Sequence, residues 1–402
     1  MDGKYRYSEK NVHDLTVAGM TVRLWSAEGT EDKATITRLF EPIARAGFVH
    51  PYLALMPDWH PGKDSVVGSV VPSREVLLPS VIGGDIGCGV SAVRLPITAG
   101  ELAHSFVLLG HRLREVIPVG TSYNSVVTDR VRDHPLWEKE LRAPVSNRTL
   151  RKLVRQFGSL GGGNHFLEIQ KDREERLWVM LHSGSRYLGV QVRDWYVERG
   201  TEQPAIDKRL YARIPYLPAS SALAIDYLAD LRLVVEFARE SRREMMLRTL
   251  EVVQEMAGQF DVADVMKEFV DINHNYVDQE ENFGETLFVH RKGAIRVAQG
   301  QKGSVPGSMG TSSFVIEGRG NDYAFFSCAH GGGRAMSRSE ATRRVSRKDY
   351  QRSLVGVVCA HSDVLLDEAP EAYKDIRVVM RGQADLVKTL CELTPVVSVK
   401  GR

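Results

Sequence analysis

The 402-residue sequence contains few cysteines, carries almost no net charge and lacks any long apolar run. Its four cysteines are too few and too far apart for a disulfide scaffold, so we expect a reduced, intracellular protein with at most one functional thiol. No apolar run approaches the ~20 residues that cross a bilayer, and the polar first residues contain no signal-peptide core. These features predict a cytoplasmic protein without a membrane partner.

The net charge of +2 excludes bulk attraction to nucleic acid, so any such binding requires a local basic patch. The usual nucleotide-binding signatures are also missing, because there is no Walker-type loop and no strand-linked Rossmann glycine pattern. A nucleotide, if bound, must be held by a different structural motif. A hydrophobic content of 43% is ordinary for a globular protein with a substantial core.

Short β-rich runs bounded by glycine or proline alternate with helical stretches. One helix is predicted from a cap at Thr30 to a stop at Gly47, and a longer one from about residue 219 to about residue 258, with Asp230 on its polar face. Six glycine-rich segments lie between residues 83 and 334, and a site built from so many loops favours one intertwined α+β domain. The β-rich runs are MTVRLW, DSVVGSVVPS, LWVMLHSGSR, SSFVIEGR and YAFFSCAHG.

Several of the glycine-rich segments carry metal-ligand residue types. Taken alone, a histidine is more often a hydrogen-bonded structural residue, and a buried cysteine is usually a small hydrophobe. Together, three histidines, an aspartate and a thiolate could bind one transition metal, or two metals that share a bridging group. The ligand types by themselves favour zinc, because Mn²⁺ prefers oxygen donors, and the spacing matches no local metal motif. The five residues are Asp85, Cys88, His165, His182 and His274.

A second group of features indicates phosphate binding. The segments SLGGGNH, PGSMGTSS and HGGGR can each present unobstructed backbone N–H groups to an anion. His330 directly precedes three glycines, which is compatible either with a tight turn or with a reactive histidine beside a phosphate. Arg334 and Arg338 add bidentate donors. The basic run from Arg338 to Arg352 is either a solvated helix face or a patch for a phosphate backbone.

Taken together, the ordered motifs of this chain resemble those of the RtcB-type RNA ligases. The resemblance spans residues 56 to 401 and implies a single large catalytic domain, taken here as residues 1–402, with sheets surrounded by helices. Each glycine motif is weak alone, but their common order makes coincidence very improbable. The motifs are MPDWHPG, GGDIGCGV, GGGNHFLEI, LHSGSR, HNYV, HRKGAIR, PGSMGTSSFV, AHGGGR, YKD and VKG.

The resemblance implies GTP- and Mn²⁺-dependent joining of RNA ends that bear a 2′,3′-cyclic phosphate or 3′-phosphate to 5′-hydroxyl ends. The five candidate ligands would hold two Mn²⁺ ions, which overrides the zinc assignment. Cys88 would bridge both ions, with His165 and His182 at one ion and Asp85 and His274 at the other.

His330 would be the nucleophile that carries GMP through a phosphoramidate bond, as suits an imidazole near neutral pH. Asp58 and His60 would support the site, and Asn164 would contact the phosphate. The remaining positions that the resemblance assigns to guanosine are Glu168, Ser308, Ser313, Gly332, Tyr373 and Lys400.

This chain departs from the commonest family pattern at two glycines and in one region. Gly87 precedes Cys88 where many members carry asparagine, and Gly332 stands where alanine is usual. The region between Thr121 and Gly158 does not resemble the common members. These departures leave the ligands and the nucleophile in place, but they make the chain a possible divergent paralogue with an RNA substrate of its own.

Three alternatives follow from the same residues. An end-capping enzyme would transfer GMP to a 3′-phosphate without efficient ligation. A catalytically silent RNA-binding homologue would use the basic run, although such a protein would be expected to lose a ligand or the nucleophile. A simple dimetal phosphodiesterase would not need Glu168 and Lys400. The ligase, acting on broken, tRNA or rRNA ends, is the function that the sequence favours.

Overall fold

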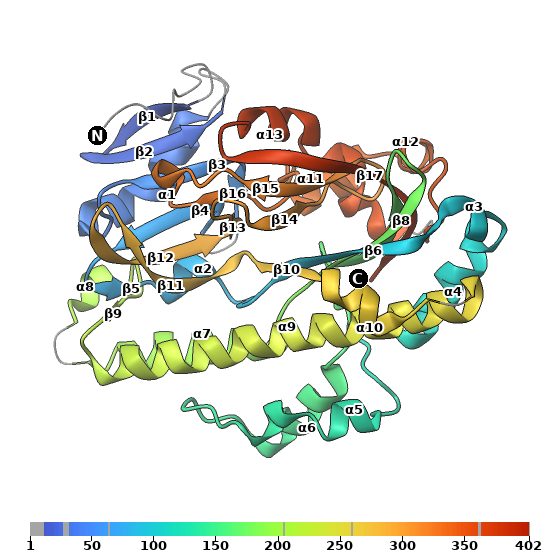
Figure 1. Ribbon diagram of the computed structural model, residues 1–402. Helices are drawn as coiled ribbons and strands as arrows, with labels where there is room; N and C mark the ends of the chain where they lie inside the picture. Colours follow the sequence, from blue (N-terminus) through green and yellow to red (C-terminus); the bar gives the residue numbers. More distant parts are fainter. Residues whose placement is uncertain are drawn as a thin grey trace.

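The structure, a computed structural model, describes residues 12–26, 32–62, 65–203, 206–258, 260–360 and 363–401. Two sheets form the upper part of the molecule in Figure 1, and the long helix α9 crosses beneath them. Helices α5 and α6 lie below α9, at the base of the view. The mixture of sheets and covering helices confirms the α+β class, while the number of domains stays a prediction.

The first sheet has six strands, among which only the β2–β3 pair is parallel. In order across the sheet they are β1 (Val12–Val17), β2 (Met20–Trp25), β3 (Leu53–Pro61), β4 (Val66–Ser73), β12 (Glu285–Lys292) and β11 (Asn275–Asn282).

The second sheet has seven antiparallel strands and carries most of the site. In order they are β10 (Val270–Asn273), β6 (Gly89–Thr98), β8 (Arg176–Ser183), β7 (Phe166–Lys171), β17 (Val387–Lys400), β15 (Ser313–Gly318) and β14 (Lys302–Val305). Two short ribbons pair β13 (Ala294–Arg296) with β16 (Ser327–Ala329), and β5 (Val76–Leu77) with β9 (Leu217–Pro218).

The helices fall between the strands and differ widely in length. The α-helices are α1 (Lys33–Ala46), α2 (Pro79–Ile82), α3 (Ala99–Leu102), α4 (Phe106–Val116), α5 (Asp129–Arg132), α6 (Asn147–Gln156), α7 (Tyr187–Gly200), α8 (Lys208–Tyr211), α9 (Ala222–Ala257), α10 (Val262–Val265), α11 (Arg338–Arg344), α12 (Arg347–Ser353) and α13 (Ile376–Gly382). The 3₁₀ turns are η1 (Ala103–Ser105), η2 (Pro135–Glu138), η3 (Met266–Glu268), η4 (Asp322–Ala324), η5 (Asp363–Glu368) and η6 (Pro370–Ala372).

The hydrophobic core joins the two sheets and fixes α9 against them. One buried cluster combines Ala54 and Val70 of the six-stranded sheet with Val305 and Ile316 of the seven-stranded sheet. A second cluster packs side chains of α4 and α9, including Met245, against β6, β7 and β8. Burial of this apolar surface holds the strand ends, and therefore the loops that follow them, in fixed positions.

The two helices predicted from the sequence are present. The first begins at an Asp32 cap, whose carboxylate accepts from Thr35 N, and ends at Gly47 in the left-handed conformation. Thr30 lies outside the described residues. The long helix is α9, but the prediction for Asp230 is wrong, because this residue is buried and accepts bonds from the Arg142 and Ala143 amides and the Tyr196 hydroxyl.

Four of the five predicted β-rich runs form strands over much of their length. In the fifth, YAFFSCAHG, only Ser327–Ala329 is a strand. Phe325 and Phe326 both have a φ of +52°, a left-handed conformation that interrupts an extended chain. This bend turns the end of β16 towards the site.

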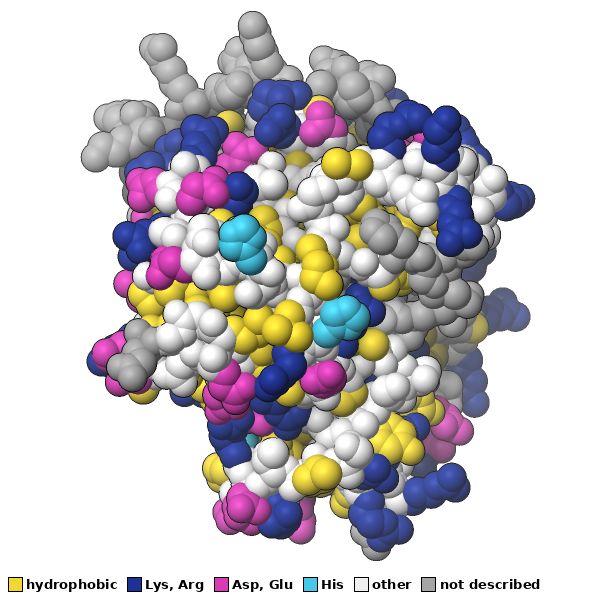
Figure 2. Space-filling view, turned by 90° about the vertical axis from the view of Figure 1, so that its right-hand side faces the viewer, with side chains coloured by type: hydrophobic (Ala, Val, Ile, Leu, Met, Phe, Trp, Pro, Cys, Tyr) yellow, Lys and Arg dark blue, Asp and Glu magenta, His cyan; other side chains and the backbone are white. Residues whose placement is uncertain are grey.

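Charge is unevenly distributed despite the small net value. On the face shown in Figure 2, acidic side chains gather mainly on the left, whereas basic side chains dominate the right margin. Within the described ranges, no helix combines the length and apolar character needed to cross a membrane.

Candidate active site

Strand register gathers separate loops at one end of the seven-stranded sheet. Gly89, the first residue of β6, lies opposite Ser183 at the end of β8 and opposite Asn273 at the end of β10. Cys88 and His274 are the next residues along these chains, and the His274 amide donates to Cys88 O at 2.8 Å. Antiparallel pairing therefore brings residues 186 positions apart into contact.

The neighbouring strands complete the same end of the sheet. Phe166, the first residue of β7, lies opposite His182 in β8 and opposite Lys400 in β17. His165 immediately precedes Phe166. Five sequence motifs thus come together, because the strands next to them begin or end at the same edge of the sheet. The sequence pattern alone does not predict this strand register.

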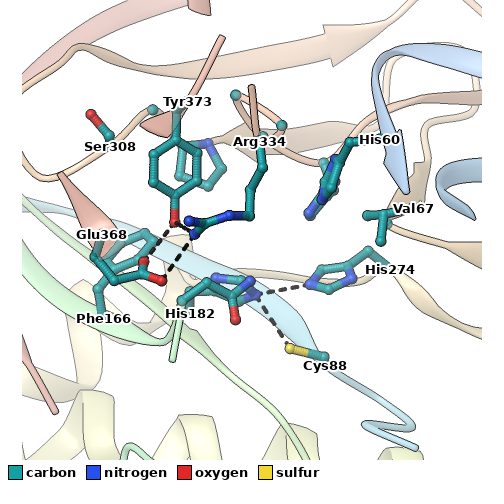
Figure 3. A pocket seen from close by; sticks show the side chains of 18 of the residues that line it. His60, Val67, Cys88, Phe166, His182, His274, Ser308, Arg334, Glu368 and Tyr373 are labelled. Carbon is teal, nitrogen blue, oxygen red and sulfur yellow. Dashed lines mark hydrogen bonds and ion pairs between the residues drawn. The ribbon is translucent and has the colours of Figure 1, made fainter. Parts of the chain in front are cut away.

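The five candidate ligands form one compact group, named here the Cys88 cluster. Cys88 Sγ lies 3.4 Å from His165 Nε2 and 3.3 Å from His182 Nε2. Two triads, each with ligand atoms within 4.8 Å of one another, share the thiol: Cys88 with His182 and His274, and Cys88 with Asp85 and His165. In Figure 3, dashed lines join His182 to both His274 and Cys88. A shared thiol between two triads is the arrangement expected for two cations with a bridging thiolate.

The division of the ligands differs from the one that the resemblance implies. His182 Nε2 lies 2.9 Å from His274 Nε2, and His165 Nε2 lies 3.0 Å from Asp85 Oδ2. His165 and His182 therefore fall in different triads, whereas the resemblance implies that they share one ion. Which ligands share an ion stays a prediction. Strand β8, which carries His182, lies between β6 and β7.

The chemistry of the cluster fits cations. His165 Nδ1 lies 2.9 Å from Leu160 O and must donate its hydrogen there, so a cation bound at Nε2 would replace the hydrogen that this nitrogen shares with Asp85 Oδ2. Likewise, His274 Nδ1 lies 3.0 Å from Asn275 Oδ1, which leaves His274 Nε2 as an acceptor facing His182. Acceptors that face one another in a buried site are stabilised by a cation between them.

Burial sets the protonation of the cluster in the absence of cations. Burial raises the pKa of the Cys88 thiol well above its ordinary value, and lowers the pKa of His182 and of His274 well below theirs. Burial would also raise the pKa of Asp85, but the hydrogen bond with His165 outweighs it and lowers the pKa to about 2. A bound cation would displace the thiol proton, because metals bind the thiolate.

A buried ion pair supports the loop that carries Cys88, and the sequence did not single it out. Arg242 of α9 donates to both carboxylate oxygens of Asp271, at 2.6 and 2.9 Å. The same guanidinium donates to Gly87 O and Ser183 O, the carbonyls on either side of the cluster. Arg242 thereby fixes the backbone of two ligand loops at once. The only sequence signal was a charged residue on the buried face of a long helix.

His330 lies against the cluster and is oriented by Asp58. Its Nδ1 is 2.6 Å from Asp58 Oδ2, and the same oxygen accepts from the amides of His330 and Gly331. The His330 ring centroid is 4.6 Å from that of His274. An ionised Asp58 holds the hydrogen on Nδ1, so Nε2 keeps the lone pair that a nucleophile needs.

His60 lines the same pocket from β3. Its Nδ1 lies 2.9 Å from Asp58 O, and burial lowers its pKa to about 4. His60 is therefore neutral at pH 7 and positions the backbone of Asp58 without adding charge beside His330.

A pocket of about 230 Å³ extends from the cluster and is lined by most of the predicted residues. Glu368, which the sequence did not single out, also lines the pocket, and Figure 3 shows it next to Tyr373 and Arg334. This buried carboxylate accepts from the Tyr373 hydroxyl at 2.6 Å and from Lys400 Nζ at 2.5 Å. Burial would raise its pKa, but Lys400 and Arg338 outweigh burial and lower it. The predicted residues that line the pocket are Asp85, Cys88, Asn164, Glu168, His182, His274, Ser308, His330, Gly332, Arg334, Arg338, Tyr373, Lys400 and His60.

Glu368 also holds both arginines that the sequence assigned to phosphate. Arg334 Nη1 lies 3.2 Å from Glu368 Oε1, and Arg338 Nη1 lies 2.5 Å from the same oxygen. Arg338 additionally contacts Asp367 at 2.6 Å. The two guanidiniums line the pocket, but part of their charge is already balanced by these carboxylates.

Glu168 and Ser313 belong to a buried polar group behind the pocket. Burial raises the pKa of Glu168 to about 7, although hydrogen bonds from Gln170 and Ser398 act against the rise. Gln170 Nε2 bridges Glu168 Oε2 and Ser313 Oγ, at 2.6 and 3.0 Å. Ser313 also accepts from the Gly307 amide and is outside the set of pocket-lining residues. Gln170 was missed by the sequence reasoning, because a glutamine within a strand carries no motif signal.

The fold and the site together define a class of protein, an α+β protein with a cysteine-centred ligand cluster beside a buried histidine. Comparison with known proteins gives its family. A family model described as "tRNA-splicing ligase RtcB" matches residues 40–401. The chain is 34% identical to the RNA-splicing ligase RtcB of Escherichia coli (strain K12), over 97% of this chain and 100% of the relative. The chain belongs to the RtcB family of ligases.

More distant relatives cover the chain to a similar extent. The tRNA-splicing ligase RtcB of Nanoarchaeum equitans is 27% identical over 100% of both chains. The tRNA-splicing ligase RtcB of Thermococcus kodakarensis is 28% identical over 94% of both chains.

Proposed function

We propose that the protein is a GTP-dependent RNA ligase that joins 2′,3′-cyclic-phosphate or 3′-phosphate ends to 5′-hydroxyl ends through a His330–GMP intermediate. The observation that carries the proposal is His330, held by Asp58 at 2.6 Å and placed beside the Cys88 cluster. An oriented imidazole next to a cation site is suited to phosphoryl transfer, which depends on positioning and charge stabilisation.

In the first step, His330 Nε2 would attack the α-phosphate of GTP. The N–P bond forms as the bond from the α-phosphorus to the bridging oxygen breaks, and pyrophosphate leaves with that electron pair. Asp58 keeps the hydrogen on Nδ1 and stabilises the positive charge that develops on the ring. The pocket beside the ring, lined by Asn164 and the glycine amides, would receive the phosphate.

In the later steps, GMP would pass from His330 to the RNA. A cyclic phosphate opens by hydrolysis to a 3′-phosphate, which then attacks the phosphorus of the His330 adduct and returns the electron pair to Nε2. The 5′-hydroxyl finally attacks the activated 3′-phosphate, forms the phosphodiester and releases GMP. Arg334 and Arg338 would neutralise phosphate charge in these steps, because both line the pocket.

The Cys88 cluster would hold two Mn²⁺ ions, with Cys88 in both triads. When bound, the ions would supply charge stabilisation for the phosphates. This chain's own contribution is the fixed ligand geometry, since Leu160 O and Asn275 Oδ1 orient His165 and His274.

The guanosine would occupy the pocket between Glu168, Ser308, Tyr373 and Lys400. The Glu168 carboxylate is suited to the N–H donors of the guanine edge, and Lys400 to its acceptors. Ser313 and Gln170 would hold Glu168 in place from behind, and Gly332 would leave room for the nucleotide.

A ligation assay tests the proposal. Purified protein with GTP and Mn²⁺ should join a 2′,3′-cyclic-phosphate RNA to a 5′-hydroxyl RNA, and His330→Ala should reduce joining by at least about 10⁴-fold, as expected when a covalent nucleophile is removed. Accumulation of only a GMP-capped 3′-end, with no joined product, would identify an end-capping enzyme and contradict the last step.

A further inference from the structure

A strongly basic helix lies outside the site, between Thr121 and Gly158. Helix α6 contains four cations and no acidic residue in ten residues. All four side chains are exposed. The four, named here the α6 cations, are Arg148, Arg151, Lys152 and Arg155.

The α6 cations have no carboxylate partner among the described residues, unlike several cations close to them in the chain. Nearby, Arg130 pairs with Glu244 at 2.6 Å, and Lys139 pairs with Glu236 at 2.5 Å. Even the basic run at α11 and α12 is partly neutralised, for example by Glu340, which lies 2.7 Å from Arg344. Four neighbouring unpaired cations on a protein of net charge +2 mark a surface suited to a polyanion.

Two exposed tyrosines stand beside these cations. The side chains of Tyr123 and Tyr187 are 43% and 52% exposed. The Arg155 guanidinium lies 4.5 Å from the Tyr123 ring centroid, and Lys152 Nζ lies 5.9 Å from that of Tyr187. The two tyrosines and the α6 cations line one surface groove, and no acidic residue is among its lining residues. Its lining residues are Tyr123, Arg148, Thr149, Arg151, Lys152, Leu153, Arg155, Gln156 and Tyr187.

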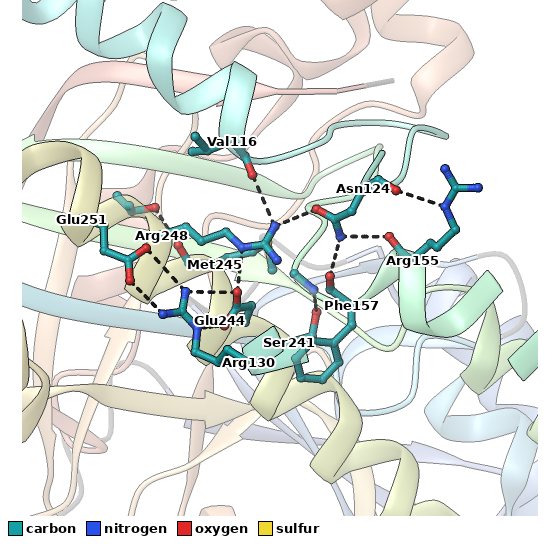
Figure 4. Close-up of polar contacts among 12 residues, drawn as sticks. Val116, Asn124, Arg130, Arg155, Phe157, Ser241, Glu244, Met245, Arg248 and Glu251 are labelled. Atoms are coloured by element: carbon teal, nitrogen blue, oxygen red, sulfur yellow. Dashed lines mark hydrogen bonds and ion pairs between the residues drawn. The ribbon is translucent and has the colours of Figure 1, made fainter. Parts of the chain in front are cut away.

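The groove is rigidly mounted on α9 (Figure 4). Asn124 Nδ2 donates to Arg155 O at 2.9 Å and to Phe157 O at 2.7 Å, and thereby ties the end of α6 to the Tyr123 loop. Asn124 Oδ1 in turn accepts from the buried Arg248 of α9 at 2.6 Å. A preorganised surface of this kind loses little entropy when it binds a ligand.

The groove also adjoins the Cys88 cluster. Tyr187 follows Arg186, whose Nη2 donates to Gly120 O at 2.7 Å. A Cβ added to Gly161 would meet both Arg186 Nη1, at 1.8 Å, and His165 Nδ1, at 2.8 Å. Arg186 therefore packs over the backbone that leads to His165, and its chain neighbour Tyr187 lines the groove.

We propose that the α6 groove binds a single-stranded segment of the RNA substrate next to its reacting end, an inference that rests on the proposed ligase function. The α6 cations contact successive phosphates, and the rings of Tyr123 and Tyr187 stack on unpaired bases. Stacking on aromatic rings and contacts to phosphates do not depend on the base sequence of the RNA, so the groove binds the strand without sequence specificity. A duplex fits less well, because its bases are already stacked on each other.

Charge removal tests the phosphate contacts. The triple variant Arg148→Gln/Arg151→Gln/Lys152→Gln should bind single-stranded RNA longer than about 16 nucleotides at least about tenfold more weakly, with a salt slope smaller by about 2. The matched control is Lys208→Gln/Arg209→Gln/Arg213→Gln at α8, which lies at a different edge of the molecule (Figure 1) and should bind as the native chain does. Fluorescence anisotropy over a salt series measures both quantities.

Ring removal tests stacking. Tyr187→Ala should weaken binding of the long strand about tenfold, whereas Tyr187→Phe retains the ring and should change it less than about twofold. In ligation assays, the triple variant and Tyr187→Ala should both raise KM for long RNA. Neither should change KM for strands shorter than about 4 nucleotides, which are too short to occupy the groove. Unaltered thermal melting identifies the variants that remain folded.

Formation of the His330–GMP adduct separates this inference from the proposed function. The α6 variants should form the adduct at the native rate, so a loss confined to RNA binding supports the groove even if ligation itself is absent. RNA affinity of the α6 triple variant equal to that of the α8 control would overturn the proposal. A triple variant that loses affinity for polyglutamate but not for RNA would also overturn it, because the face would then bind an acidic protein.

Discussion

At the scale of single residues, hydrogen bonds to fixed partners determine which nitrogen of each histidine faces the site. Leu160 O holds Nδ1 of His165, and Asp58 Oδ2 holds Nδ1 of His330. In both cases Nε2 remains available, for a cation in the first and for a phosphorus in the second. The residue types were recognisable in the sequence, and Asp58 was predicted as a supporting residue, but the atom that each histidine nitrogen contacts was not predictable from the motifs.

The glycines after His330 provide a residue-level test. Gly333 has a φ of +66°, and a Cβ there would lie 2.1 Å from Asp58 O. Gly333→Ala should therefore destabilise the protein by at least about 2 kcal/mol, since it adds a backbone clash to left-handed strain. Gly332 is the matched control, because a Cβ there meets nothing closer than 3.7 Å. Gly332→Ala should change stability by less than about 0.5 kcal/mol in urea unfolding. Equal losses in the two variants would contradict the described turn.

The space around an added Cβ also differs between Gly87 and Gly332, the two glycines that depart from the family pattern. Alanine fits at position 332, so this departure needs no change in the surrounding structure. Gly87 has a φ of +74°, and a Cβ there would approach Val235 Cα of α9 to 2.8 Å. In this chain α9 packs too closely behind Gly87 for a larger residue at that position.

At the scale of elements, the position of α2 depends on a buried histidine in β12. The Leu78 amide, at the start of α2, donates to His290 Nε2 at 3.0 Å, and His290 Nδ1 lies 2.9 Å from Val71 O. This pair of bonds requires the neutral ring, with hydrogen on Nδ1 only. Because α2 leads into the Asp85–Cys88 loop, His290 links the six-stranded sheet to the cluster.

This link predicts a pH dependence of stability. Burial lowers the pKa of His290 to about 4, whereas an unfolded histidine titrates near 6.5. The unfolded chain binds more protons between these values, so the free energy of unfolding should fall as pH drops from about 6.5 to 4, by about 3 kcal/mol from this residue. His290→Gln, whose amide oxygen can still accept from Leu78, should show a shallower fall in urea unfolding at stepped pH. If the free energy of unfolding fell equally with pH in the native protein and in His290→Gln, His290 would not be the cause of the pH dependence.

The elements also show where sequence reasoning succeeded and where it failed. The ends of α1 and α9 were predictable because a cap, a glycine stop and a 3.6-residue period are local signals. The roles of Asp230 and Arg242 on α9 were not predictable, because their partners lie on other elements, 34 to 88 positions away for Asp230 and 29 or more for Arg242. The run at α11 was correctly seen as basic, but its pairing with Glu340 and Glu368 emerged only in three dimensions.

At the scale of the whole molecule, the site exists because one end of the seven-stranded sheet collects loops from residue 85 to residue 400. The ordered motifs predicted the family and most of the pocket-lining residues. They could not predict which histidines pair around Cys88, because strand order decides that. Glu368 was not predicted either, because it lies in no glycine motif and its partners Arg334, Arg338 and Lys400 come from other parts of the chain.

The central claim is that His330 carries GMP, and covalent labelling tests it most directly. Protein incubated with Mn²⁺ and α-labelled GTP should acquire an acid-labile label, and mass spectrometry of peptides prepared at alkaline pH should place it on His330. His330→Ala should remain folded and acquire no label. A label that persists in this variant, or a native protein that acquires none, would contradict the account.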